Sequence, residues 1–293
     1  MRMPDRATCL LCRFLLCFLT AHAFVLPALA DSQAPVTGAN DPAAKVLSSR
    51  TNKIEVVGAH FQITRPDGSI VSQAELAGAT IALEDDRGNA LRLYIADAEP
   101  DPTDPNHEVV LYTIYSQDPE SGALRPVCRA GPDGMAKAFP LNGTWTPTGE
   151  HVPSATAFSL TCTAGVIGKC VRWGYKPWKK AKDGTPLWKL HQACTRMARA
   201  DYCGIGVSHT RNGTPINIFD RIGIQIADPD ASTTFEAAWG PEGAICVRKV
   251  RIPEEYSIEE LERTCPRLKG KVGKQCTEQR ALQFDDAIIF DRS

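Results

Sequence analysis

Four side chains that could do acid–base or metal chemistry lie within 30 residues of one another. They are His191, Asp201, His209 and Asp220. A set of histidines and aspartates can position a water molecule or bind a metal ion. The competing interpretation is structural, because His191 and Asp201 are ten residues apart and cannot share adjacent turns of a helix. In that case Asp201 accepts backbone N–H bonds near a helix end, and the histidines cap helices or lie on the surface.

A second group combines positive charge with aromatic rings. Between positions 169 and 182 there are six basic residues, no acidic residue and three aromatic residues. The set is Lys169, Arg172, Trp173, Tyr175, Lys176, Trp178, Lys179, Lys180 and Lys182. Clustered cations repel one another unless solvent or an anionic partner compensates them. The pattern therefore predicts that an anionic envelope component is bound by charge and stacking. The alternative is a set of solvated lysines around a small aromatic core.

The chain begins with features of a secretory signal peptide at residues 1–30. Three arginines precede or enter an apolar stretch that ends in Ala28-Leu29-Ala30, the small-x-small pattern that signal peptidase cleaves. From Phe14 to Leu26 the apolar run has only about 13 residues, short of the roughly 20 that a spanning helix needs. We therefore expect cleavage before Asp31, no transmembrane segment in the mature chain, and a periplasmic or secreted location.

Cysteine usage agrees with export. Of the 11 cysteines, three leave with the signal peptide. The other eight are Cys128, Cys162, Cys170, Cys194, Cys203, Cys246, Cys265 and Cys276. An even number in an oxidising compartment predicts disulfides, although eight cysteines allow 105 pairings. Zinc is not indicated, because no CxxC pair remains in the mature chain. We expect no metal and no cofactor.

The charge balance excludes a globally basic nucleic-acid binder. The whole chain holds 33 basic and 34 acidic residues, and the signal segment contains three of the former and one of the latter. The mature chain therefore has 30 basic and 33 acidic residues, a net charge of −3. Such a balance argues against nucleic acid as a partner.

The residues after the signal peptide divide into three regions by composition and by secondary-structure signals. Residues 31–50 are small and polar and predict a flexible leader. Residues 51–162 are rich in strand signals, including two successive hairpins at 58–71 and 78–91 with glycines at their turns. The Pro-rich segment 100–105 predicts a loop. The cysteine-rich region 163–293, which we expect to pack with the β-rich region, mixes helices and strands.

Helix signals in this last region are local. Residues 163–173 predict a short helix, and a clearer one begins at Pro186, with Gly204 as its expected end. Ser257 to Glu260 has the pattern of a capping box that opens a last helix. Alternation at 222–226 and the apolar residues 287–290 predict strands.

Three stretches, GKCVRWGYKPW at 168–178, LHQACTRMARADYCG at 190–204 and SHTRNGTPINIFDRIGIQ at 208–225, resemble the bacterial ADYC-domain family. The family's motif stands here as Ala200-Asp201-Tyr202-Cys203, and the segment from Phe158 to Cys162 leading into Lys169-Cys170 is similar too. The resemblance is specific over about 160–225. It implies an exported, cysteine-rich protein without assigning it an activity, and it brings no catalytic residue with it.

These observations predict an α+β fold, predominantly β with two or three short helices, stabilised by disulfides. For function they favour an exported cell-envelope or secreted binding or structural module. The alternative is a hydrolase or metal-dependent enzyme built on the His/Asp group. The two differ in one geometric respect, because an enzyme needs the four side chains to converge in one pocket.

Overall fold

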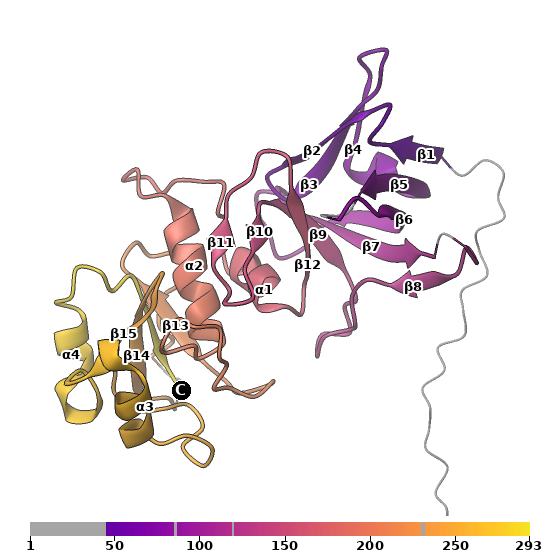
Figure 1. The fold of residues 1–293 in the computed structure, drawn as a ribbon. Helices are drawn as coiled ribbons and strands as arrows, with labels where there is room; N and C mark the ends of the chain where they lie inside the picture. Colours follow the sequence, from indigo (N-terminus) through magenta and orange to yellow (C-terminus); the bar gives the residue numbers. More distant parts are fainter. Residues whose placement is uncertain (1–44, 85–86, 119, 230–231) are drawn as a thin grey trace, which may run out of the picture. The chain divides into compact units, whose positions relative to one another are not determined.

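Strands dominate the N-terminal part of the chain, where β-branched and aromatic residues alternate with polar ones. The computed structural model describes residues 45–293 except for 85–86, 119 and 230–231 (Figure 1). The predicted signal peptide and residues 31–44 of the predicted leader lie outside the described residues. The main sheet has the strand order β1-β5-β6-β7-β9-β12, with β8 beside β7. Its strands are β1 (Lys45–Ser48), β5 (Ala79–Glu84), β6 (Ala90–Pro100), β7 (Val110–Gln117), β8 (Leu124–Pro126), β9 (Ala138–Asn142) and β12 (Phe158–Cys162).

Both predicted hairpins are present. The first lies in a three-stranded sheet of β2 (Lys53–Val57), β3 (His60–Thr64) and β4 (Ile70–Ser72), and β5 with β6 forms the second. The small sheet packs on the main sheet: Phe61 and Ile63 of the former share a buried cluster with Ile81, Ile95 and Tyr112 of the latter. A 3₁₀ turn, η1 (Gln73–Leu76), joins the two hairpins.

The predicted leader is too long at its C-terminal end. Residues Lys45–Ser48, expected to be flexible, form β1, which pairs in parallel with Ala79–Ala82 of β5. Arg50 extends this contact with an ion pair to Glu84 at 2.8 Å. A four-residue edge strand carries too little periodicity to be recognised in the sequence, so only pairing with its partner reveals it.

The C-terminal region places helices against both faces of an antiparallel sheet with the order β13-β16-β14-β15. One face packs with α2 around Trp239, and the other packs with α4 around Phe290, while α1 packs against α2 and β12. Figure 1 shows α2 and α4 beside this sheet. The elements are α1 (Val166–Arg172), α2 (Leu187–Ala198), β13 (Asn217–Asp220), β14 (Phe235–Gly240), β15 (Gly243–Val247), α3 (Ile258–Thr264), η2 (Pro266–Leu268), η3 (Gly273–Gln275), α4 (Glu278–Ala281) and β16 (Ile289–Arg292). A short ribbon of β10 (Thr144–Trp145) and β11 (His151–Val152) precedes β12.

The predicted helices are present, but their ends differ from the predicted ones. Ser257 caps α3 by accepting a hydrogen bond from the Glu260 N–H. Helix α2 was expected to begin at Pro186, but Pro186 is its N-cap and the helix runs from Leu187 to Ala198 rather than to near Gly204. Ala200 takes a left-handed conformation with φ of 49°, and the Asp201 and Ala200 N–H groups bond to the Arg196 and Met197 carbonyls. This is a Schellman motif with alanine in the usual glycine position, which the sequence does not signal.

The strand expected at 222–226 is wrong. These residues form turns, because the Asp220 carboxylate accepts hydrogen bonds from the N–H groups of Ile222, Ile224 and Gln225. A carboxylate that accepts hydrogen bonds from three nearby N–H groups bends the backbone and removes those donors from any sheet ladder.

All eight cysteines expected in the mature chain form disulfides, which confirms the prediction of a disulfide framework. The pairs are Cys128–Cys162, Cys170–Cys194, Cys203–Cys265 and Cys246–Cys276, with Cα–Cα distances of 5.6 to 5.8 Å.

The fold class is confirmed as α+β, mostly strands and disulfide-stabilised. In the part of the chain that the structure describes there are four short α-helices, one more than expected, because the single turn α4 is too short to show helical periodicity. None of the helices in this part combines the length and apolarity required to cross a bilayer. The described residues belong to one compact unit, so a boundary at 162/163 stays a prediction from sequence texture.

Candidate functional site: a basic cavity

Of the two histidines in the His/Asp group, His191 is buried and His209 is partly exposed. His191, on α2, is fully buried, and its Nε2 lies 3.1 Å from the Ile167 carbonyl oxygen. Burial lowers the pKa of this imidazole to about 4, so it is neutral at pH 7. His209 is sandwiched between the rings of Tyr202 and Tyr256, at centroid distances of 5.9 and 4.2 Å. Burial also lowers the pKa of His209.

The two aspartates organise backbone. Asp201 is buried, pairs with Arg196 at 2.7 Å, and accepts hydrogen bonds from the N–H groups of Ile205 and Gly206. Asp220 accepts the hydroxyl hydrogen of Tyr175 at 2.9 Å in addition to its three backbone bonds. Each of the four side chains therefore has an internal partner. Within the group, the charge of Asp201 acts electrostatically on His209 and partly opposes the lowering of its pKa.

The Ala-Asp-Tyr-Cys motif ties α2 to the rest of the C-terminal region. Ala200 closes the helix, and Asp201 holds the following loop. Tyr202 is buried, stacks on Trp239 at 5.3 Å, and donates its hydroxyl hydrogen to Glu236 at 2.9 Å. Cys203 forms its disulfide with Cys265. Every residue of the motif thus has a structural contact, and each contact is with a different part of the chain.

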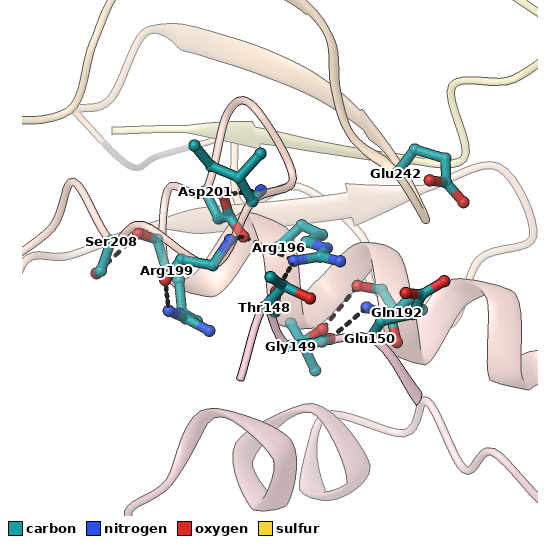
Figure 2. Close-up of polar contacts among 12 residues, drawn as sticks. Thr148, Gly149, Glu150, Gln192, Arg196, Arg199, Asp201, Ser208 and Glu242 are labelled. Carbon is teal, nitrogen blue, oxygen red and sulfur yellow. Dashed lines mark hydrogen bonds and ion pairs between the residues drawn. The ribbon is translucent and has the colours of Figure 1, made fainter. Parts of the chain in front are cut away.

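Figure 2 shows the polar network around the end of α2. Arg196 lies between Asp201 and the loop that carries Thr148, and its guanidinium donates to both. Gln192, one turn earlier, donates to the Gly149 carbonyl at 2.7 Å and accepts from the His151 N–H. Arg199 donates to the Gly206 carbonyl. This network connects the motif to the β10–β11 ribbon and accounts for the burial of its charges.

The aromatic residues of the 169–182 segment are not an exposed stacking platform. Tyr175 is fully buried and bonded to Asp220. Trp173 is half-buried and packs against the core of the C-terminal region. Trp178 is half-buried and packs near Gly58 and the inner face of the main sheet. None of these three aromatic rings lines the cavity described below, so the stacking interaction predicted for this segment has no aromatic residue to provide it.

Three of the six cations in the segment form ion pairs with acidic residues that lie elsewhere in the sequence. Arg172 bonds to the buried Asp101 at 2.7 Å. Lys176, itself buried, bonds to Asp104 and Glu108, each at 2.7 Å. Lys179 bonds to the other oxygen of Glu108 at 2.5 Å. All three acids belong to the Pro-rich loop after β6, which docks on the segment through these ion pairs.

Two of the remaining three lysines, Lys180 and Lys182, line a cavity of about 720 Å³ between three loops. Its walls come from residues 103–109, 171–187 and 221–224, and we call it the basic cavity. Six cationic side chains and two carboxylates line it: Arg172, Lys176, Lys179, Lys180, Lys182, Arg221, Asp104 and Asp183. Asp101 and Glu108 pair with three of these cations, and including them gives four carboxylates against six cations, an excess of two positive charges.

Two of the walls are held in place by their own hydrogen bonds. Backbone bonds from Ala181 to Thr185 and from Leu187 to Lys179 close the 179–187 loop, which presents Lys180 and Lys182 as exposed side chains. On the opposite wall, the Arg221 guanidinium donates hydrogen bonds to the backbone carbonyls of Leu282, Phe284 and Ala287. Lys169, from the same segment, is outside the cavity lining.

Sequence reasoning missed Arg221 and the acidic loop, since their contribution depends on contacts between residues that are 61 to 72 positions apart. The excess of acids at 101–108 was a readable signal, because it is the natural complement of the basic segment. None of the His/Asp group lines the basic cavity. Among the described residues, no three His, Cys, Asp or Glu side chains gather in a way that could hold a metal ion.

Comparison with known proteins supports the resemblance seen in the sequence. The model of the ADYC domain matches residues 73–253, which is more than half of the chain. No curated protein and no solved structure matches. The matched range includes the Ala200–Cys203 motif, the Arg196 network and all three walls of the basic cavity. The chain therefore belongs to the ADYC domain family.

Proposed function

We propose that this protein is an exported binding module that holds an anionic component of the cell envelope in the basic cavity. The observation that carries this proposal is the pair of exposed lysines, Lys180 and Lys182, on the cavity wall. Within the described part of the chain neither lysine forms an ion pair, and the neighbouring Asp183 carboxylate accepts a hydrogen bond from the Thr185 N–H. A cavity of this size lies in the range that small ligands occupy, and its positive excess favours an anion.

The rival hydrolase receives no support from a specific observation. Its four side chains each serve an internal contact, and the basic cavity has neither a histidine nor a cysteine in its lining. A general base must lie within hydrogen-bond reach of the proton that it removes. His191, fully buried against the Ile167 carbonyl, has no such access.

The proposed location is the periplasm or the extracellular space. Four disulfides form and persist in oxidising compartments, and such a framework is rare in the cytosol. The predicted signal peptide at 1–30 is the route to that compartment.

Export makes a direct prediction about the N-terminus. When the full chain is expressed in a bacterium and recovered from the periplasm or medium, N-terminal sequencing should give Asp31 as the first residue, because Ala28-Leu29-Ala30 is the cleavage pattern. Recovery of intact chains that begin at Met1, or retention of the full-length chain in the membrane fraction, would contradict the proposed processing.

The binding role is tested by removing the two unpaired lysines. We expect Lys180→Ala combined with Lys182→Ala to weaken binding of an anionic, phosphate-bearing polymer at least about tenfold at low salt, because two charges near a ligand anion are lost. Binding should also fall as salt rises from about 0.05 to 0.5 M. Co-sedimentation with this polymer and with a neutral polysaccharide measures both effects.

The matched control is Lys271→Ala combined with Lys274→Ala. These two exposed lysines lie outside the cavity lining, and their loss changes the net charge by the same amount. The proposal requires the control to bind like the wild type. Equal binding of the wild type to the anionic and neutral polymers, or equal losses in the two double variants, would refute it.

A further inference from the structure

The Glu108 carboxylate neutralises part of the positive charge of the basic cavity. Its two carboxylate oxygens are divided between two lysines, with Oε2 at 2.7 Å from Lys176 Nζ and Oε1 at 2.5 Å from Lys179 Nζ. Two ammonium groups on one carboxylate are the arrangement that a bound phosphate or carboxylate group would adopt with the same lysines. Glu108 is therefore a built-in anion at this wall.

The neighbouring Asp104 has a different task. Its side chain is only 5% exposed, and its oxygens accept hydrogen bonds from the N–H groups of Asn106, Glu108 and Val109 in addition to Lys176. Asp104 thus shapes the loop and compensates the buried Lys176 charge. Loss of Asp104 would disturb the loop itself.

The Glu108 side chain, in contrast, is 30% exposed, and its carboxylate bonds to the two lysines. The backbone of Glu108 is held independently, through its N–H bond to Asp104 at 2.8 Å. The carboxylate can therefore be replaced while the loop remains in place. Its removal would leave Lys179 without its ion-pair partner and Lys176 with Asp104 alone.

Two positions for an anionic group follow from this geometry. One is open and lies near Lys180, Lys182 and Arg221 on the cavity walls. The other lies between Lys176 and Lys179 and is filled by Glu108.

We propose that Glu108 sets the charge class of the ligand: by filling the Lys176–Lys179 position, it restricts the basic cavity to ligands that present one anionic group. This inference rests on the proposed binding function. A ligand with several linked anionic groups must displace Glu108 or bring its additional charge close to that carboxylate, which repels it. The preferred ligand therefore brings a single phosphate or carboxylate group into the cavity, as a polymer whose anionic groups are well separated also does.

The test compares inorganic phosphate with tripolyphosphate as probes, by isothermal titration calorimetry at low salt. Glu108→Gln keeps the size of the side chain and removes its charge. We expect the variant to bind tripolyphosphate at least about fivefold more tightly than the wild type, since one opposing charge at contact distance is removed. The affinity for phosphate should change by less than about twofold.

The matched control is Glu84→Gln, which removes a carboxylate that is paired with Arg50 outside the cavity lining. It changes the net charge equally and should leave both affinities unchanged. Adding Lys179→Gln to Glu108→Gln should return the tripolyphosphate affinity to the wild-type level, because it removes the freed cation. A gain in affinity cannot come from misfolding, so loss of structure does not mimic the expected result.

The outcomes separate the two proposals. If the wild type binds phosphate in a way that requires Lys180 and Lys182, but Glu108→Gln gains no more for tripolyphosphate than Glu84→Gln, the role of Glu108 is wrong and the basic cavity stands. An equal gain for both probes in Glu108→Gln would also overturn the selectivity. If the wild type binds neither probe nor an anionic polymer, the proposed function fails and the inference fails with it.

Discussion

Arg251→Met should lower the free energy of unfolding by about 3–5 kcal/mol, the effect of removing one partner from a buried ion pair. The Arg251 side chain is only 1% exposed, and it lies against two carboxylates that are not exposed at all. Since small domains are stable by only about 5–15 kcal/mol, such a loss is a large part of the total. Urea unfolding at pH 7, monitored by tryptophan fluorescence without reductant, measures it.

The size of the effect follows from the number of groups that Arg251 satisfies. Its guanidinium donates to Glu236 at 2.9 Å and to Asp291 at 2.7 Å, and it also donates to the Met197 carbonyl at the end of α2. A cation at this position stabilises the negative end of the helix dipole as well. Burial opposes the charged form of Arg251, but the charges of Glu236 and Asp291 outweigh this and raise its pKa.

The carboxylates in this cluster are sensitive to the loss of the cation. Burial raises the pKa of Asp291, and the nearby charge of Glu236 raises it further. The Asp291 Oδ1 also accepts the indole N–H of Trp239 at 2.8 Å, so the cluster reaches into the core of the C-terminal region. Without Arg251 the carboxylates keep their desolvation cost but lose their main compensation.

Arg211→Met is the matched control for this prediction. Arg211 makes an ion pair with Glu255 at 2.5 Å, but both side chains are more than half exposed. Exposed pairs contribute about 0–1 kcal/mol, so this variant should unfold close to the wild type. If Arg251→Met and Arg211→Met have the same stability within about 1 kcal/mol, the buried cluster is not the stabilising element described here.

The elements that the sequence predicts are those defined by local residues. Ser257 and Glu260 are three residues apart, and that spacing alone is enough to locate the start of α3. The turn glycines, Gly68 and Gly88, adopt positive φ angles of 81° and 79° between paired strands. Each of these signals acts within one turn, so the rest of the fold is not needed to read it.

The wrong predictions concern segments whose structure depends on residues that are distant in the sequence. Strand β1 depends on Ala79–Ala82, more than 30 residues further along the chain. The residues 222–226 alternate like a strand, yet the Asp220 carboxylate and the Tyr175 hydroxyl hold them as turns. Such tertiary contacts outweigh local preference, which is weak for short segments.

The candidate site shows the same limit. Its basic segment is evident in the sequence because six cations fall in 14 positions. Whether each cation is available depends on Asp101, Asp104 and Glu108, which lie about 70 residues earlier. Charge reversal at Lys179 would therefore break an internal ion pair, and Lys180 and Lys182 are the better positions for a test of binding.

The disulfide Cys170–Cys194 connects stability to the basic cavity. It joins α1 to α2, both sulfurs are buried, and the 24-residue separation encloses the whole 171–187 wall. Replacing both cysteines by alanine should lower the free energy of unfolding by about 3–4 kcal/mol, through the entropy that the unfolded chain regains. It should also weaken phosphate binding about fivefold to tenfold, because the lysine-bearing wall is less well ordered before the ligand arrives.

Removal of Cys246–Cys276 separates these two effects. That bond closes a similar loop, with a separation of 30 residues, and both of its sulfurs are buried as well, but it lies outside the cavity walls. Its double alanine variant should lose about the same stability and keep the wild-type affinity for phosphate. Urea unfolding and calorimetry on the two double variants measure the stability and the affinity. Alkylation of the denatured single variant Cys170→Ala checks the pairing, because it should label one thiol, that of Cys194. If the two double variants lose affinity equally, general destabilisation explains the loss and the Cys170–Cys194 bond has no particular part in ordering the cavity.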